Sequence, residues 1–249
     1  MIDSARPREV RVQAHTIGFT LLRSNRRSIG FVIRDGSLRV TAPRWVTLSQ
    51  IDDAVVRKAD WILSRQAAWH DQQQQAAGQR YCWEDGGRIP YLGCNIRLRH
   101  TGTRGQFDGD PDAPRDDDDL WLGLPEDAGV ERFRQATLHW LQARAYDFMG
   151  RRLQHFLESA DLRINKWRLS GAATRWGSCS SKGNIMLNWR LIHFTPDIID
   201  YVIAHELAHL RQMNHSPAFW AEVGQLLPGY QAARQALRKH HLTSLPSFT

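Results

Sequence analysis

The sequence predicts an α+β protein, with a β-rich N-terminal half and a C-terminal half in which helices alternate with strands. Residues 10–42 alternate apolar and polar side chains at the period of two that a strand requires. Residues 127–162 instead repeat apolar side chains at the period of an amphipathic helix. The 249 residues, 42% of them hydrophobic, suffice for a sizeable core. We expect two regions, residues 1–125 and residues 126–249.

The N-terminal half opens with three predicted strands and continues into a helix. The strands cover residues 16–22, 28–33 and 37–42. Asp35-Gly36 between the last two strands is typical of a tight hairpin. Thr47 or Ser49 is suited to cap a helix over residues 50–75, where apolar side chains recur at helical spacing. Strands and helix together predict a small packed layer.

The rest of the N-terminal half contains an acidic loop between further strands. Residues 91–99 predict a strand or hairpin, and Leu120-Trp121-Leu122 predicts another strand. Residues 101–119 are rich in Gly, Pro and Asp, and the acidic stretch 108–119 ends in four consecutive aspartates. Such carboxylates can bind cations, but a run of like charges is more often solvated. We therefore expect a mobile loop here.

The C-terminal half begins with the long amphipathic helix and continues with shorter elements. They are strands over residues 166–174 and 184–191, expected to be antiparallel, and helices that start at Thr195-Pro196, Ser216-Pro217 and Pro228. Proline at the first helical position is a common start signal. We expect the helix that begins at Pro196 to run to Met213 and to end in a left-handed turn at Asn214.

The helix after Thr195 carries the most informative motif, His205-Glu206-Leu207-Ala208-His209. Residues four apart lie on one face of a helix, so both imidazoles can bind one metal ion. Glu206 lies about 100° further round the helix, where its carboxylate can reach a water bound to that ion. The motif therefore predicts metal-assisted hydrolysis with Glu206 as the general base.

A catalytic zinc ion usually has three protein ligands and one open position for water. His215 is the best third ligand, because the chain turns out of the helix just before it, and Glu222 on the next helix is its rival. Cys179 is a possible fourth ligand, which would close the site and make it structural. Neutral imidazoles suit zinc, although nickel, cobalt or manganese would also be compatible.

The segment Arg175–Cys179 forms a second cluster, on a turn shortly before the motif helix. Arg175 can polarise a carbonyl or phosphoryl oxygen in a transition state, so it is a candidate catalytic residue. The alternative is a tight turn packed by Trp176, with Arg175 in a structural ion pair. Weaker candidates nearby are Asn188, Arg190 and His193. A lone histidine of this kind is more often structural.

Composition limits the partners and the compartment. The net charge of +7 permits contact with nucleic acid but does not demand it, because no nucleic-acid-binding motif accompanies the many arginines. The first residues lack the apolar stretch of a signal peptide, and no apolar run reaches the roughly 18 residues that cross a bilayer. Three cysteines without zinc-finger spacing fit a reducing compartment. We therefore expect a cytoplasmic protein without a membrane partner.

Four stretches carry a resemblance to a known family. They are RWGSC at 175–179, NWRLI at 188–192, IDYVIAHELAHL at 199–210 and NHSPAFW at 214–220. Together they resemble the YgjP-like metallopeptidase family, which is similar to the SprT-like and WLM groups of zincins. The resemblance is strongest over about residues 165–240 and implies a zinc-dependent hydrolase, so we expect residues 126–249 to form a zincin-like domain. It also implies His205, His209 and His215 as ligands and Glu206 as the base.

The resemblance says little about the substrate, so three functions stay open. The first is a zinc-dependent metallopeptidase acting on peptides. The second is a metal-dependent nucleoside triphosphate (UTP) pyrophosphohydrolase, which the many arginines near the motif would suit. The third is a non-enzymatic binding module that zinc merely stabilises.

Overall fold

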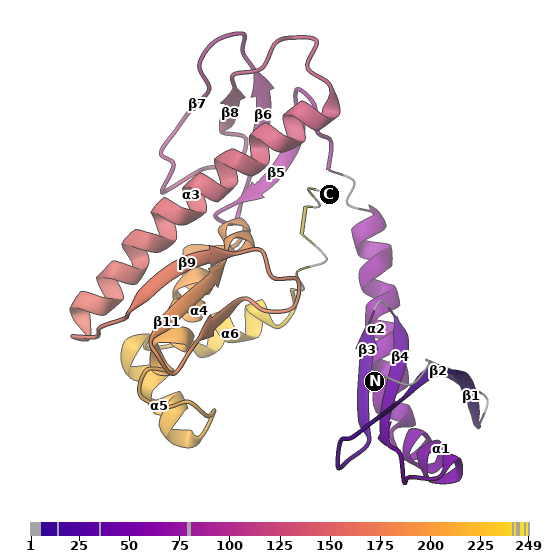
Figure 1. The fold of residues 1–249 in the computed structure, drawn as a ribbon. Helices are drawn as coiled ribbons and strands as arrows, with labels where there is room; N and C mark the ends of the chain where they lie inside the picture. Colours follow the sequence, from indigo (N-terminus) through magenta and orange to yellow (C-terminus); the bar gives the residue numbers. More distant parts are fainter. Residues whose placement is uncertain are drawn as a thin grey trace. The chain divides into compact units, whose positions relative to one another are not determined.

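The chain folds into two compact units, Met1–Gln79 and Arg80–Thr249 (Figure 1). The computed structural model describes residues 6–13, 15–34, 36–78, 81–240, 242, 245–246 and 248. Residues 1–5, where the sequence predicts no signal peptide, and Asp35 of the predicted hairpin lie outside the described residues. Strands dominate the first part of the chain and helices the C-terminal part, which confirms the α+β class.

Unit 1 is a four-stranded sheet with two helices. Its strands are β1 (Arg6–Val12), β2 (His15–Ser24), β3 (Gly30–Arg34) and β4 (Ser37–Pro43), in the order β1-β2-β4-β3. The inward side chains of β2 and β4, such as Phe19 and Val40, are buried with Ile51 and Val55 of the first helix in one core. Unit 1 therefore has a hydrophobic core of its own.

The helical region of unit 1 is divided in two. Helix α1 (Leu48–Arg57) and helix α2 (Ala59–Gly78) meet at Lys58, where the sequence predicts one continuous helix. Thr47 is the N-cap, as expected, and forms a reciprocal capping box with Gln50. The cap fixes where α1 begins, since it satisfies backbone N–H groups that the helix itself leaves free.

Unit 2 contains two sheets and the long helix α3 (Val130–Ser159). The first sheet consists of β5 (Arg88–Tyr91), β6 (Cys94–His100), β7 (Gln106–Phe107) and β8 (Asp119–Leu122), in the order β5-β6-β8-β7. The second consists of β9 (Lys166–Ser170), β10 (Gly177–Cys179) and β11 (Asn184–Asn188), in the order β10-β11-β9. Helix α3 runs past both sheets and contacts β8 and β9 (Figure 1).

The contacts divide the chain at residues 79/80, whereas the sequence suggests a division near residue 125. The reason lies in the core of unit 2. Ile89, Ile96 and Leu120 of the first sheet are buried in the same hydrophobic cluster as Leu141 and Phe148 of α3. The sheet over residues 88–122 thus groups with the C-terminal helices.

The strands of the second sheet do not pair as the sequence predicts. β9 and β11 are parallel, with Lys166 opposite Asn184, and only the short β10 is antiparallel to β11. A connection over residues 171–176 carries the chain across, so that β10 adds to the other side of β11. The buried amide of Asn188 donates hydrogen bonds to the carbonyl oxygens of Ala172 (2.8 Å) and Arg175 (3.0 Å) and holds this connection in place.

Four short helices complete unit 2. They are the 3-10 helix η1 (Trp189–His193), α4 (Pro196–Ala208), α5 (Pro217–Leu226) and α6 (Gln231–Leu237). Helix α4 is buried on nearly all sides, in contact with α3, α5, α6, β10 and β11. Within the described parts of the chain, no helix is both long and apolar enough for a membrane crossing.

Helix α4 ends earlier than the sequence predicts, at Ala208 and not at Met213. The N–H groups of Arg211 and Gln212 both donate to the carbonyl oxygen of Ala208, at 3.1 and 3.0 Å, so the chain tightens into turns. Asn214 does not adopt a left-handed conformation. The earlier end bends the chain back towards α4 and brings His215 near the motif.

Candidate metal and catalytic site

Three histidine side chains meet at the C-terminal end of α4. His205 comes from the helix and His209, four residues later, is its C-cap, while His215 comes from the loop that follows. The ring centroids are 4.9 to 5.1 Å apart in all three pairs. Each ring offers one nitrogen to a group whose members all lie within 4.8 Å of one another. We call these three side chains the histidine cluster.

The separation of the nitrogens fits a metal ion. Nε2 of His205 and Nε2 of His215 are 3.1 Å apart. Two imidazole nitrogens on a tetrahedral zinc ion, with Zn–N bonds of about 2.0–2.1 Å, lie roughly 3.3 Å apart. The donor set, three imidazoles and no carboxylate, is one that zinc accepts. The cluster therefore meets the geometric and chemical requirements of a zinc site.

Two contacts orient the rings of the cluster. Nδ1 of His209 lies 3.0 Å from the carbonyl oxygen of Gln212 and donates to it, which leaves Nε2 with a free lone pair. The fully buried ring of Phe219 on α5 packs against all three imidazoles, with centroid distances of 4.6 to 4.9 Å. Ser216 caps α5, as the sequence predicts, and so fixes where Phe219 lies.

Burial favours the neutral form of His205 and His215. Burial, together with the neighbouring His209 and His215, lowers the pKa of His205 to about 4. The pKa of His215 is also lowered, first by burial and then by the charges of His209 and Arg234. A neutral imidazole is the form that binds a metal, so these rings need release no proton on binding at neutral pH.

Glu206 lies against the neighbouring strand β10. The side chain is buried, and burial raises its pKa to about 8, while the positive charge of Arg175 opposes that rise. A Cβ atom at Gly177 would lie only 2.5 Å from Oε1 of Glu206. Glycine at position 177 therefore makes room for the carboxylate, a requirement that the sequence pattern alone does not reveal.

The other predicted residues lie outside the cluster. Arg175 is exposed and faces a cavity of about 470 Å³, together with Arg168 and Ser178. Arg190 stacks on Trp189, 4.6 Å from the ring centroid. His193 is buried, and its Nδ1 donates to the carbonyl oxygen of Pro90 at 2.7 Å. Asn188, Arg190 and His193 therefore have structural contacts, and His193 is the structural histidine that we expected.

Neither alternative ligand joins the cluster. Among the described residues, the group of potential metal ligands contains the three histidines alone. Glu222 pairs with Arg211 at 2.9 Å. The Cys179 thiol lies 3.4 Å from the carbonyl oxygen of Ser180, and burial and the charge of Glu206 raise its pKa to about 11. A site with three protein ligands leaves a coordination position open.

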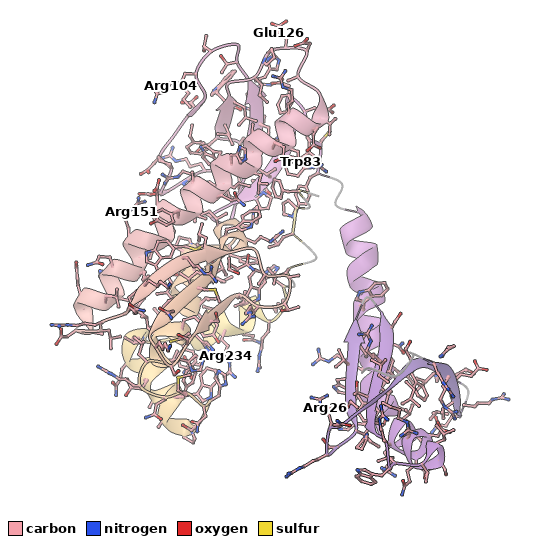
Figure 2. The ribbon with its side chains drawn as sticks, in the orientation of Figure 1. Arg26, Trp83, Arg104, Glu126, Arg151 and Arg234 are labelled. Carbon is pink, nitrogen blue, oxygen red and sulfur yellow. The ribbon has the colours of Figure 1, made fainter. Side chains whose placement is uncertain are left out.

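A cleft of about 650 Å³ opens beside His215. It is lined by Trp176, Tyr201, His215, Trp220, Arg234, Leu237, Arg238 and His240. Arg234, which Figure 2 shows at the C-terminal helices of unit 2, comes from α6, about 20 residues after the cluster. Arg234 lies in none of the four stretches that carry the family resemblance, and Tyr201 and Trp220 lie within two of them without a role that the sequence reveals.

The chain is similar to one family of proteins and, over part of its length, to two solved structures. A family model described as YgjP-like, metallopeptidase domain, matches residues 27–240. No curated protein matches the chain. Among solved structures, this chain is similar to the metallopeptidase zymogen abylysin of Pyrococcus abyssi, with 24% identity and a TM-score of 0.33 over 36% of this chain and 93% of that one. It is also similar to the metallopeptidase zymogen jannalysin of Methanocaldococcus jannaschii, with 21% identity and a TM-score of 0.32 over 36% and 92%.

Proposed function

Because this chain belongs to the YgjP-like metallopeptidase family, we propose that it is a zinc-dependent hydrolase of the metallopeptidase type. In this proposal the histidine cluster holds the metal, and Glu206 is the general base. One observation carries it: three imidazoles converge next to a buried carboxylate at the edge of an open cleft.

When bound, zinc would lower the pKa of a coordinated water towards about 7 and polarise the bond to be cleaved. Glu206 would take the proton from that water and pass it to the leaving group. A nearby cation favours an ionised carboxylate and so offsets the effect of burial on Glu206. We assign to Arg175 a supporting role, because its charge also favours the ionised form of Glu206.

The free edge of the second sheet supports a peptide substrate. The order β10-β11-β9 leaves β10 at the edge, and β10 contacts α4 next to Glu206. An extended peptide can add to such an edge through main-chain hydrogen bonds. The strand β11, by contrast, lies in the centre of the sheet, between β10 and β9.

The nucleotide pyrophosphohydrolase remains the second candidate, since two guanidinium groups, those of Arg234 and Arg238, line the cleft. The structural-zinc candidate has less support. A closed site would require a fourth protein ligand, and Cys179 does not lie with the cluster.

A paired assay tests the proposal. Zinc-loaded protein is incubated with casein or a peptide library and, separately, with UTP, and the release of amines and of phosphate is followed. We expect amine release that disappears in Glu206→Gln while the zinc content stays the same. Full hydrolytic activity in Glu206→Gln would refute the assigned mechanism, and phosphate release alone would favour the nucleotide candidate.

A further inference from the structure

We propose that Arg234 and Arg238 form a subsite for a carboxylate group of the substrate, so that the protein prefers acidic peptides. The proposal deepens the proposed hydrolase function and rests on it. The two arginines lie four residues apart on and just after α6, hence on one face, and both line the cleft beside His215.

Stacked aromatic rings hold Arg234 in place. Its guanidinium lies 3.8 Å from the ring centroid of Trp220. The Trp220 ring is stacked on Tyr230 at 5.8 Å and 10°, and Tyr230 is stacked on Tyr201 at 6.1 Å and 8°. A cation over an indole face is held without using its N–H donors. Arg234 therefore keeps its hydrogen-bonding edge available for a ligand.

Neither arginine is paired with a carboxylate of the residues that the structure describes. None of the ion pairs between described residues includes Arg234 or Arg238. Other arginines of unit 2, such as Arg152 and Arg211, pair with a carboxylate. An incoming carboxylate would therefore form new charge-assisted hydrogen bonds without breaking an existing pair.

The subsite lies close to the proposed reaction centre. His215 and Arg234 line the same cleft, and both contact the ring of Trp220, His215 at a centroid distance of 5.8 Å and the Arg234 guanidinium at 3.8 Å. Tyr201 lines this cleft as well. Tyr201 is one helical turn before His205. A carboxylate held by the arginines would thus be near the bond to be cleaved.

The lining of the cleft favours a carboxylate on a peptide. Beside the two arginines stand the side chains of Trp176, Trp220 and Leu237, which offer apolar contact for a peptide chain. Two guanidinium groups carry two positive charges, which exceed the single negative charge of a carboxylate but fall short of the about four negative charges of a nucleoside triphosphate at neutral pH, roughly one and a half to two of which lie on its terminal phosphate. The carboxylate can come from an acidic side chain or from the C-terminus of the peptide.

Binding without turnover tests the proposal independently of catalysis. Full-length, zinc-loaded Glu206→Gln protein is titrated with fluorescent peptides that differ only in Glu versus Gln at one position, and the anisotropy is measured. The Glu peptide should bind about 10- to 100-fold more tightly, the range for hydrogen bonds to a charged group. When Arg234→Gln and Arg238→Gln are both introduced into the Glu206→Gln protein, the preference for the Glu peptide should disappear. Lys239→Gln, which removes a neighbouring charge outside the cleft, should retain it.

Further arms identify the source of the carboxylate and guard against misfolding. Amidated peptides isolate the acidic side chain, and neutral peptides with a free C-terminus isolate the terminal carboxylate. Arg238→Glu, at an exposed position, should reverse the preference in favour of a Lys peptide without unfolding the protein. Circular dichroism confirms the fold of each variant.

Three outcomes would overturn the subsite: equal affinity for every charged and neutral pair, a preference that survives both arginine substitutions, or tighter arginine-dependent binding of UTP. Hydrolysis by the wild-type protein is scored separately. A charge preference without any hydrolysis would reject the proposed function and keep the subsite. Zinc-dependent hydrolysis without a charge preference would support the proposed function and reject the subsite.

Discussion

The acidic loop over residues 108–119 and the histidine cluster both gather groups that bind cations, but the partners of those groups differ. In the loop, Asp112 pairs with Arg144 and with Arg151, which Figure 2 shows on α3. Asp119 pairs with Arg97 at 2.6 Å. These carboxylates are already neutralised by the protein.

In the cluster, by contrast, the nitrogens face one another, and Nδ1 of His205 is buried without a hydrogen-bond partner among the described residues. Most aspartates of the loop are exposed to solvent, as expected, and its ion pairs in addition tie β6, β8 and α3 together. The comparison teaches that partner geometry, more than the density of potential ligands in the sequence, separates a metal site from a structural one.

The largest effect is expected from substitutions that compare the histidine cluster with the acidic loop. His209→Ala should weaken zinc binding by more than about 100-fold, since losing a group that merely orients a ligand already costs about 10- to 100-fold. Hydrolysis should be lost with the metal. Asp116→Asn in the loop keeps the oxygen that accepts the Asn95 N–H and should leave zinc content unchanged. Metal analysis of both purified variants measures their zinc content. An unchanged zinc content in His209→Ala would contradict the assignment of His209 as a ligand.

The next effect separates the base from the ligands. Gly177→Ala places a methyl group 2.5 Å from Oε1 of Glu206 and must displace the carboxylate. A shift of about 1 Å at a reacting group costs on the order of 100-fold in rate, so kcat should fall by that factor while zinc is retained. Ser178 lies on the same strand but lines the cavity beside Arg168 and Arg175, so Ser178→Ala is the matched control. Equal rates in both variants would contradict the placement of Glu206.

A smaller effect concerns a histidine outside the cluster. Burial lowers the pKa of His193 to about 4, below the ordinary value of 6.5. Between pH 6.5 and pH 4, His193 is protonated in the unfolded chain but neutral in the folded chain. The free energy of unfolding therefore falls as the pH decreases. The stabilisation is complete above pH 6.5 and lost by pH 4, a change of about 3 kcal/mol.

Urea denaturation of the wild type and of His193→Gln, at several pH values between 7 and 4, measures this dependence. Glutamine does not titrate, so the stability gap between the two proteins should narrow in acid. His139→Gln, at an exposed histidine of α3, is the control and should leave the gap to the wild type constant. A constant gap for His193→Gln as well would show that burial of His193 does not govern acid stability.

The smallest effect tests the loop alone. Asp119→Asn weakens two hydrogen bonds with Arg97, at 2.6 and 3.1 Å, and should cost about 1 kcal/mol. The hydrogen bond from Arg97 lowers the pKa of Asp119, so this stabilisation is present above the ordinary pKa of the carboxyl and lost as the pH falls through the lowered value. Urea denaturation at pH 7 and pH 2.5 should show the difference shrinking in acid. A cost that stays constant would point to lost packing instead of lost charge.

Sequence alone predicts the features that depend on neighbouring residues. The spacing of apolar residues predicts α3, and Thr47 and Ser216 predict two helix starts, because capping is a local interaction. The four-residue spacing of His205 and His209 places both rings on one helix face for the same reason. That these side chains bind zinc is still a prediction.

Features that depend on packing between distant parts of the chain cannot be predicted from neighbouring residues in this way. No local pattern shows that β9 and β11 are parallel. The pairing depends on the connection from β9 to β10, which passes β11 to reach its other side. Arg234 enters the cleft only because α6 packs against α4 and Trp220 of α5 supports the guanidinium. Gly177 meets Glu206 across two elements that are separate in the chain.

The ring of Phe219 has a consequence for which metal the protein would accept. Three neutral imidazoles bind copper more tightly than zinc when affinity alone decides, so discrimination has to come from an imposed coordination geometry. All three rings rest on one buried phenyl group, which itself is anchored by the cap of α5. We therefore expect metal selectivity to reside in the packing of Phe219, and a smaller side chain there to make the protein accept copper and nickel more readily.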